Sequence, residues 1–408
     1  MRDVAKTRSP YQIDHLSTLE QLDALETEWS ELLDENPDAP IFLTWEWIRT
    51  WWLHFGQGHQ LWLLTARDKQ GRLVGIAPLM REGYRKGLMR LDTLAFIGTG
   101  PACPTHLKVL ACAPDKEGVY RAFLGFLQAQ RGQWDVLRIA SVAMDSAEYP
   151  WLTAAGGRVR TAGQTICSYI PLPADWETFL NTADPHARSK LRSIRARLER
   201  NHPGMVQFSC ITDPRDLDGA MAKLEELIRN RCHAKALATD WDDPTFATFH
   251  RAIASLALSR GWLRLYTLAV EDRVIAVVYN FRFKDWIYGY NAGFDPNWKQ
   301  YSPSRLLLEH LIKSSIEEAA SVLDMGPGKS EYKSALSDRE RVENEILFGH
   351  NWKGNLWITF GNLERAIRTK VKRLLVRPDK KQMNQPRSMP PAKTEEGSPA
   401  RCAVAAKE

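Results

Sequence analysis

A short apolar segment ending on Asp324 carries the strongest chemical signal in the sequence. It breaks into Gly-Pro-Gly and is followed by Tyr332 and Lys333. A carboxylate at a strand end can act as a general base or orient one, or simply accept hydrogen bonds from loop N–H groups. Lys333 offers a cation for an oxyanion or a phosphate, and Tyr332 a proton for a departing thiolate. A solvated lysine and a core tyrosine are the alternative interpretations. These three residues are the catalytic candidates.

Upstream of that segment, an aromatic strand is followed by the start of a helix. Free N–H groups at a helix N-terminus bind phosphate, and a serine there also caps the helix. Residues of a strand that borders a cleft can equally be core, because side chains alternate between the two faces. The candidates for binding a donor are Tyr290, Asn291, Gln300, Tyr301, Ser302 and Ser304.

Three further polar residues follow a predicted helix that ends near Arg229. Arg231, His233 and Lys235 could contact an anionic acceptor. A lone histidine is more often structural or exposed, so a structural role is the alternative for His233.

Hydrophobic periodicity and turn residues place these candidates on a mixed α/β scaffold. A capping box at Ser17 and Glu20 and a cap at Thr44 begin the first two helices. The first part is predicted to hold helices through 22–33, 45–55 and 120–128 and strands over 61–66, 73–80, 91–97 and 136–139. The second part is predicted to hold helices over 185–200, 214–229, 244–259, 304–319 and 355–375 and strands over 206–211, 263–269, 274–283, 286–291, 322–324 and 342–348. Because both parts follow the same order of elements, we expect a duplicated fold.

Composition and charge set the domain boundaries. We expect a flexible N-terminus over 1–15, domains over 16–165 and 166–376, a basic helix over 186–200 within the second, and a disordered basic tail over 377–408. Residues 365–408 hold twelve Lys or Arg and four Asp or Glu, a net of +8 against +6 for the whole chain. The remainder is therefore close to neutral, which argues against a dedicated nucleic-acid binder.

The cysteine pattern and the hydropathy of the chain indicate the cellular compartment. None of the six cysteines forms a Cys-x-x-Cys pair or a Cys/His pattern typical of zinc, so we expect reduced thiols and no metal. The N-terminus lacks the apolar core of a secretory signal. No run of 18 uncharged apolar residues is present, so we predict no membrane span and a cytoplasmic protein.

Residues 16–363 resemble the tandem GNAT-like acyltransferases. The group is that of the cellulose-biosynthesis-associated (CelD/BcsL-like, BioF2-like) acetyltransferases, and the FemABX aminoacyltransferases of peptidoglycan synthesis are more distantly similar. The phrases that carry the resemblance are Tyr290-Asn-Ala-Gly-Phe-Asp295, Tyr301-Ser-Pro-Ser304 and Asp324-Met-Gly-Pro-Gly-Lys-Ser-Glu-Tyr-Lys333. The resemblance implies two GNAT-like domains, each a mostly antiparallel mixed sheet flanked by helices. It also implies a transfer site near the second, where the backbone at Tyr290 and Asn291 receives the acyl group.

The resemblance implies an acyltransferase that moves an acyl group from acetyl-CoA or another acyl-CoA to an amine or hydroxyl. The acceptor it implies is a sugar, glycolipid or polysaccharide precursor, as in cellulose or exopolysaccharide biosynthesis. One departure is that Gln300-Tyr-Ser-Pro-Ser-Arg305 lacks both glycines of the turn that cradles the CoA pyrophosphate. Another is the lack of the helical-hairpin insertion of FemABX enzymes, which disfavours tRNA. An aminoacyl-tRNA-dependent transferase and a catalytically inactive binding module remain the alternatives.

Two surface features invite partners. The basic helix over 186–200 and the one after Leu363 are either solvated faces or surfaces for anionic polymer, RNA or lipid head groups, which leaves peripheral membrane contact open. The tryptophans at 45, 47, 51 and 52 are either a sugar-stacking platform or packing between the domains.

Overall fold

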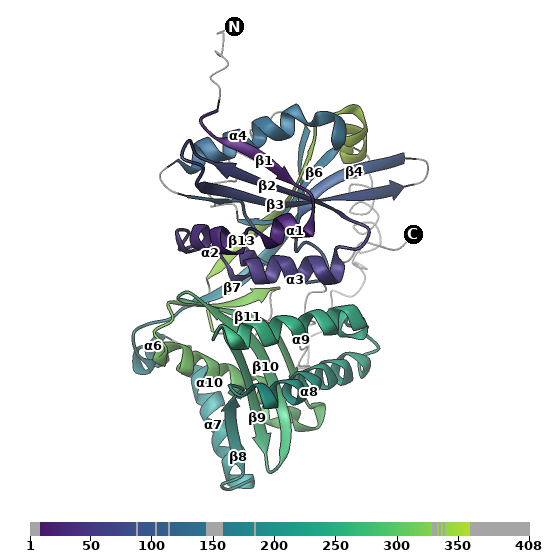
Figure 1. Cartoon of the computed structure of the whole chain (residues 1–408). Helices are drawn as coiled ribbons and strands as arrows, with labels where there is room; N and C mark the ends of the chain where they lie inside the picture. The colour runs from purple at the N-terminus through teal and green to yellow at the C-terminus, as the bar shows by residue number, and fades with distance from the viewer. Residues whose placement is uncertain are drawn as a thin grey trace, which may run out of the picture.

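The structure is a computed structural model. It describes residues 9–86, 89–102, 104–112, 115–143, 158–182, 185–328, 333, 336–337 and 339–359. Tyr332, the predicted tail over 377–408 and most of the predicted last helix therefore lie outside the described residues, although residues 352–359 are helical. Figure 1 shows two halves, one above the other, with strands running from one into the other.

The first half places helices on both faces of a mostly antiparallel sheet. Its elements are β1 (Gln12–Leu16), α1 (Leu19–Asp23), α2 (Glu26–Asp34), η1 (Ile41–Leu43), α3 (Trp45–Phe55), β2 (Gln60–Arg67), β3 (Leu73–Lys86), β4 (Met89–Phe96), β5 (Leu110–Ala111), α4 (Lys116–Ala129), η2 (Arg131–Gln133) and β6 (Val136–Ala143). Thr44 caps α3 as predicted, because its Oγ1 accepts a hydrogen bond from the Trp47 N–H at 3.2 Å.

The start of the chain corrects one prediction. The capping box is formed by Thr18 and Gln21, one residue later than Ser17 and Glu20, because the backbone of Thr18 is extended (φ −125°, ψ 155°) and so takes the N-cap position. The single helix expected through 22–33 is broken into α1 and α2.

The second half repeats the arrangement. It is preceded in the chain by β7 (Arg158–Pro171), which follows β6 of the first half. Its own elements are α6 (Trp176–Thr182), α7 (Pro185–Asn201), β8 (Val206–Cys210), α8 (Pro214–His233), η3 (Asp240–Asp242), α9 (Pro244–Ser259), β9 (Leu263–Val270), β10 (Arg273–Phe283), β11 (Trp286–Phe294), η4 (Pro296–Tyr301), α10 (Pro303–Glu317), β12 (Val322–Pro327) and β13 (Glu340–Gly349). Asp213 and Asp243 cap α8 and α9, each followed by a proline in the first turn.

One sheet of thirteen strands runs through the described parts of both halves. Its order is β1-β2-β3-β4-β6-β13-β7-β12-β11-β10-β9-β8, with β5 beside β3. Two pairs are parallel, β4 with β6 and β11 with β12, and each parallel pair is joined through a helix, α4 or α10. The order is thus the same from either edge to the centre, which confirms the duplicated, mostly antiparallel mixed α/β fold.

The halves exchange their last strands. β13 follows β12 along the chain but pairs with β6 of the first half, and β7 follows β6 but pairs with β12 of the second. The two exchanged strands pair with each other from Glu340 opposite Ser168 to Gly349 opposite Arg158. The predicted boundary between 165 and 166 falls inside β7.

Helix α3 packs against α9 where the halves meet, as Figure 1 shows. Trp47 and Trp51 are each only 1% exposed, and the Trp47 ring contacts Phe249 and Phe281 edge-to-face. Trp47 therefore serves packing between the halves, while the Trp51 ring contacts Phe55 and His59 of the first half. Both rings are buried, so the sugar-stacking interpretation is wrong for them. A second core lies under α7 and α10, on the other face of the second half.

Candidate active site

Strands β11 and β12 separate part-way along their length. They pair in parallel only from Trp286 opposite Val322 to Tyr288 opposite Asp324. β12 then follows β7 through an irregularity between Asp324 and Pro327, while β11 continues to Phe294 beside β10. The rest of β11 thus loses its neighbour on one edge, which leaves backbone groups without a strand partner there.

A β-bulge and a glycine shape this opening. Asn280 of β10 faces Gly289 and Tyr279 faces Asn291, so Tyr290 is the extra residue of a bulge. Bulges of this kind re-aim side chains and end pairing beside active sites. A Cβ on Gly289 would lie 2.8 Å from the Asp324 carbonyl oxygen, so only glycine allows so close an approach of the two strands.

Asp324 ends the paired part of β12 and is 2% exposed. Its Oδ1 accepts a 2.6 Å hydrogen bond from the Gly326 N–H, and its Oδ2 contacts His106 Nε2. Burial opposes ionisation, but His106, the Gly326 N–H and the charge of Lys333 outweigh it, so the pKa of Asp324 lies below its usual value. Asp324 is therefore an ionised, fully engaged carboxylate.

His106 comes from the first half and was not among the predicted site residues. Its backbone N–H donates to Glu343 Oε1 at 2.8 Å, and its Nδ1 lies 2.5 Å from the same oxygen, although in a direction outside hydrogen-bond geometry. Burial alone would lower the pKa of His106, but the charges of Asp324 and Glu343 outweigh it and raise the pKa to about 9. His106 is therefore an imidazolium between two buried carboxylates.

Lys333 holds the loop that follows β12. Its Nζ donates to the carbonyl oxygens of Gly326, Pro327 and Gly328 at 3.0, 2.9 and 3.1 Å. Burial lowers the pKa of Lys333, against the opposing charge of Asp324. The three donors of the ammonium group are thus used by the backbone, so neither a solvated lysine nor a free oxyanion donor describes it.

Tyr290 and Asn291 take different roles in this structure. The Tyr290 hydroxyl donates to the Ala102 carbonyl at 2.5 Å and lies 3.0 Å from His250 Nε2. His250 is fully buried among aromatic rings, which lowers its pKa to about 3. Asn291 Oδ1 accepts from the Ala292 N–H at 3.1 Å. Tyr290 therefore ties β11 to the first half, while Asn291 stays beside the unpaired part of the strand.

The tip of α10 follows β11 through the short helix η4. Ser302 occupies the N-cap position but makes no side-chain cap, because its backbone is left-handed (φ 44°, ψ 55°); the predicted serine cap is wrong. Ser304 Oγ in the first turn is buried and has no hydrogen-bond partner among the described residues. A polar atom of this kind at a helix N-terminus suits an anionic ligand.

Helix α7 anchors the segment before α10. Arg197 Nη2 donates to the Gln300 carbonyl oxygen, and Asn201 Nδ2 donates to the Tyr301 hydroxyl at 2.8 Å. The side chain of Tyr301 is core, only 7% exposed. Gln300 and Tyr301 therefore position the helix tip.

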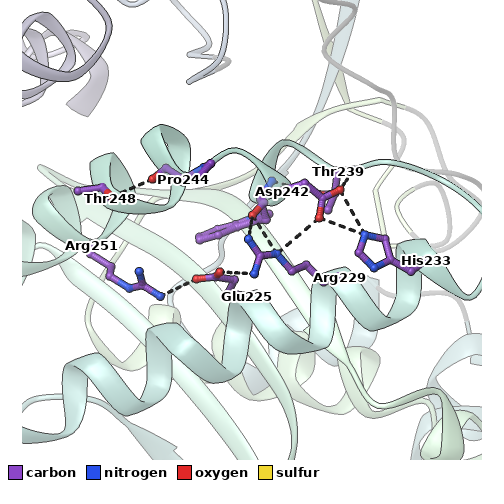
Figure 2. A network of polar contacts seen from close by, with 9 residues as sticks. Glu225, Arg229, His233, Thr239, Asp242, Pro244, Thr248 and Arg251 are labelled. Atoms are coloured by element: carbon purple, nitrogen blue, oxygen red, sulfur yellow. Dashed lines mark hydrogen bonds and ion pairs between the residues drawn. The ribbon is translucent and has the colours of Figure 1, made fainter.

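The three predicted acceptor contacts are spread out. The Arg231 guanidinium lies 5.9 Å from the Phe294 ring centroid at the end of β11. His233 Nε2 pairs with Asp242 Oδ1 at 3.0 Å in an exposed network that joins α8, η3 and α9 (Figure 2). Lys235 is exposed. Arg231 alone borders the candidate site, and His233 is structural, which was the alternative interpretation.

A cavity of about 40 Å³ lies elsewhere, between α4 and the sheet of the first half. Its lining is apolar, with Phe96, Phe123 and Leu137 among the residues, and none of the candidate residues contributes to it. Among the described residues, no group of three or more His, Cys, Asp or Glu could hold a metal ion. No helix in the described part of the chain is long and apolar enough to cross a bilayer.

A comparison with known protein families matches part of the second half. Residues 185–334 match the family model described as "Acetyltransferase (GNAT) domain". This range includes β11, α10, β12 and Lys333. No curated protein matches the chain.

Several solved structures are similar. FemX is 13% identical over 83% of this chain and 98% of its own, with a TM-score of 0.54. The C-terminal domain of a putative lysylphosphatidylglycerol synthetase from Agrobacterium fabrum is 10% identical over 83% of this chain and 96% of its own (TM-score 0.48). A tandem GNAT protein from the clavulanic acid biosynthesis pathway is 12% identical over 82% and 98% (TM-score 0.42). The likeness to FemX extends over both halves and is one of fold.

Proposed function

We propose that the chain is an acyltransferase whose donor is an acyl-CoA held between β11 and β12. The observation that carries this proposal is the opening itself: pairing of the two strands stops at Tyr288 and Asp324, β11 bulges at Tyr290, and the tip of α10 follows. An extended thioester ligand can complete the free edge of β11 through backbone hydrogen bonds. Its phosphates can meet the first-turn N–H groups of α10 and the Ser304 hydroxyl.

Transfer proceeds by direct attack. The amine or hydroxyl of the acceptor attacks the thioester carbonyl, the C–S bond breaks, and the thiolate takes up the proton that the nucleophile loses. The step forms no acyl-enzyme. Three of the described cysteines, Cys112, Cys167 and Cys210, are poor thiolate nucleophiles, because burial raises their pKa values. The work of the protein is to position both reactants and to polarise the carbonyl.

Asp324 and Lys333 support this site instead of reacting in it. Both oxygens of Asp324 are bound by Gly326 and His106, and Lys333 is bound by three carbonyls. They fix the backbone where β12 leaves β11. The acceptor, in keeping with the sequence resemblance, is a sugar, glycolipid or polysaccharide precursor, with Arg231 beside the end of β11 to meet an anionic group.

Thermal unfolding with CoA, acetyl-CoA and longer acyl-CoAs tests the donor. A ligand at 100 times its dissociation constant stabilises the folded state by about 2.7 kcal/mol, so Tm should rise by several degrees. The Ser304→Asp variant should lose most of this rise, because a carboxylate in the first turn of α10 repels phosphate while suiting the helix dipole. Ser255→Asp, on the exposed side of α9, is the matched control. No Tm rise with any acyl-CoA would refute the proposed donor.

A FemX-like, aminoacyl-tRNA-dependent transferase is the second candidate. The similarity in fold to FemX and the exposed cations of α7 favour it. Lys190, Arg192 and Arg200 are exposed, and in the described part of the chain none of them makes an ion pair. Binding of charged but not of uncharged tRNA, without a response to acyl-CoA, would select this candidate.

A further inference from the structure

The segment between β4 and β5 reaches from the first half onto both strands of the opening. It contacts β11 through the Ala102 carbonyl, which accepts from the Tyr290 hydroxyl at 2.5 Å. Four residues later, His106 contacts Asp324 on β12 and Glu343 on β13. One segment of the first half therefore touches the bulge of β11 and the last paired residue of β12.

His106 adopts an unfavourable backbone to make these contacts. Its φ is +58°, a left-handed conformation that costs a residue with a side chain on the order of 1–2 kcal/mol. In this conformation both the backbone N–H and the ring face the buried carboxylates. Such strain persists only where surrounding contacts hold it, and it is often found at functional positions.

The carboxylates need this cation. The side chains of Asp324 and Glu343 are 4% and 0% exposed, and an uncompensated buried charge is strongly destabilising. Lys333 adds charge near Asp324, but its three hydrogen bonds go to the loop after β12. His106 is therefore the group that contacts both carboxylates.

We propose that His106 is a positioning residue: it holds the segment from the first half against β12 and thereby sets the geometry of the opening in which the donor binds. The role of the opening rests on the proposed function. The positioning itself does not, since it concerns the conformation of β11 and β12 with or without a ligand. Both can be measured on the full chain.

The first measurement is amide hydrogen exchange in wild type and His106→Asn. Asparagine tolerates left-handed φ but supplies no cation. We expect faster exchange in residues 286–294 and 322–327 of the variant, at a pH and temperature where circular dichroism shows it folded. His350→Asn is the control: it removes another partly buried histidine, whose Nε2 lies 2.6 Å from the Trp134 carbonyl oxygen, and should leave both segments unchanged. Unchanged exchange of both segments in folded His106→Asn overturns the proposal.

The second measurement is acetyl-CoA affinity by calorimetry. We expect His106→Asn to weaken binding by about tenfold, which corresponds to about 1.4 kcal/mol, and His350→Asn to bind as wild type. If wild type does not bind acetyl-CoA, the proposed donor fails and the exchange result alone decides the role of His106. If His106→Asn binds as tightly as wild type, the inferred link between His106 and the donor site is wrong.

Discussion

Two carboxylates and a histidine make the centre of the molecule sensitive to pH. Asp324 and Glu343 lie on strands either side of β7, both buried, and both contact His106. The pKa of His106 is raised to about 9 by these partners, whereas an unperturbed histidine titrates near 6.5. A group whose pKa is raised on folding stabilises the folded state while it is protonated, and loses that contribution as pH rises.

The free energy of unfolding should therefore fall between pH 6.5 and 9. The contribution is fully present below the unfolded pKa of about 6.5, and its full size is on the order of 3 kcal/mol. Asp324 acts with the opposite sign: its pKa is depressed, so its contribution is lost as pH falls below about 3.8. Urea unfolding at pH 6.0, 7.5 and 9.0 measures the first effect. If the free energy of unfolding falls with pH no more steeply in wild type than in His106→Asn, His106 is not the titrating group.

Replacing Lys333 should cost stability, whatever its effect on turnover. Lys333→Met keeps most of the aliphatic stem but leaves the carbonyls of Gly326, Pro327 and Gly328 without their donor. A buried polar group left without a partner costs about 1–3 kcal/mol. We therefore expect the free energy of unfolding, measured in urea, to fall by about 2–3 kcal/mol. Lys190→Met on the exposed face of α7 should change stability by less than about 0.5 kcal/mol. Equal effects of both changes would contradict the role of Lys333 in holding the loop after β12.

At the scale of elements, the spacing of β11 and β12 depends on glycine. A Cβ at position 289 would lie 2.8 Å from the Asp324 carbonyl oxygen, and one at Gly326 would lie 3.0 Å from the Gly289 carbonyl oxygen. Gly289→Ala should therefore push the strands apart. We expect a loss of about 1–3 kcal/mol in stability and a smaller Tm rise with acyl-CoA.

The control for that change is Gly125→Ala in α4. A Cβ there meets no atom within 4 Å, and alanine is a better helix former by about 1 kcal/mol. Gly125→Ala should thus be neutral or stabilising in the same urea titration. If the Gly289→Ala protein is as stable as wild type, the two strands can accommodate a Cβ at this position.

Elements with a strong local signal were predictable from the sequence. The helix over 244–259 has the predicted bounds, because Asp243 caps it, Pro244 starts it and its apolar residues repeat at helical spacing. The turn residues Asp68 and Gly71 predict the hairpin of β2 and β3. The break between α1 and α2 was not predicted. β1 and β7 were not predicted, since their identity depends on pairing with distant partners and not on a local pattern. β1 covers residues 12–16, so the N-terminus expected to be flexible over 1–15 is a strand in its last part.

The candidate site was predictable only where its residues carry a local sequence signal. Asp324 and Lys333 stand out locally because a strand ends in Gly-Pro-Gly. His106 lies 218 positions from its partner Asp324, and its flanking residues show no periodicity. The signal that could have pointed to it is indirect: two buried carboxylates on apolar strands require a cation from elsewhere.

At the scale of the whole molecule, the exchange of β7 and β13 makes the halves depend on each other. β6 would have a free edge without β13, and β12 would have one without β7. β13 also carries Ile346, Leu347 and Phe348, which are 2%, 3% and 5% exposed. Burying three such side chains contributes about 5–9 kcal/mol, comparable to the net stability of a typical domain, about 5–15 kcal/mol.

Neither half should therefore fold alone, and the two should fold together. A chain ending at residue 336 lacks β13, so we expect it to be insoluble or without a cooperative unfolding transition. A chain ending at residue 376 keeps every described residue and should unfold within a few degrees of the full chain. Fragments 1–172 and 173–376, produced together, should copurify in equal amounts, because the first supplies β7 to β12 of the second and the second supplies β13 to β6 of the first. A soluble, cooperatively folded 1–172 fragment made alone would show that the first half completes its own sheet without β13.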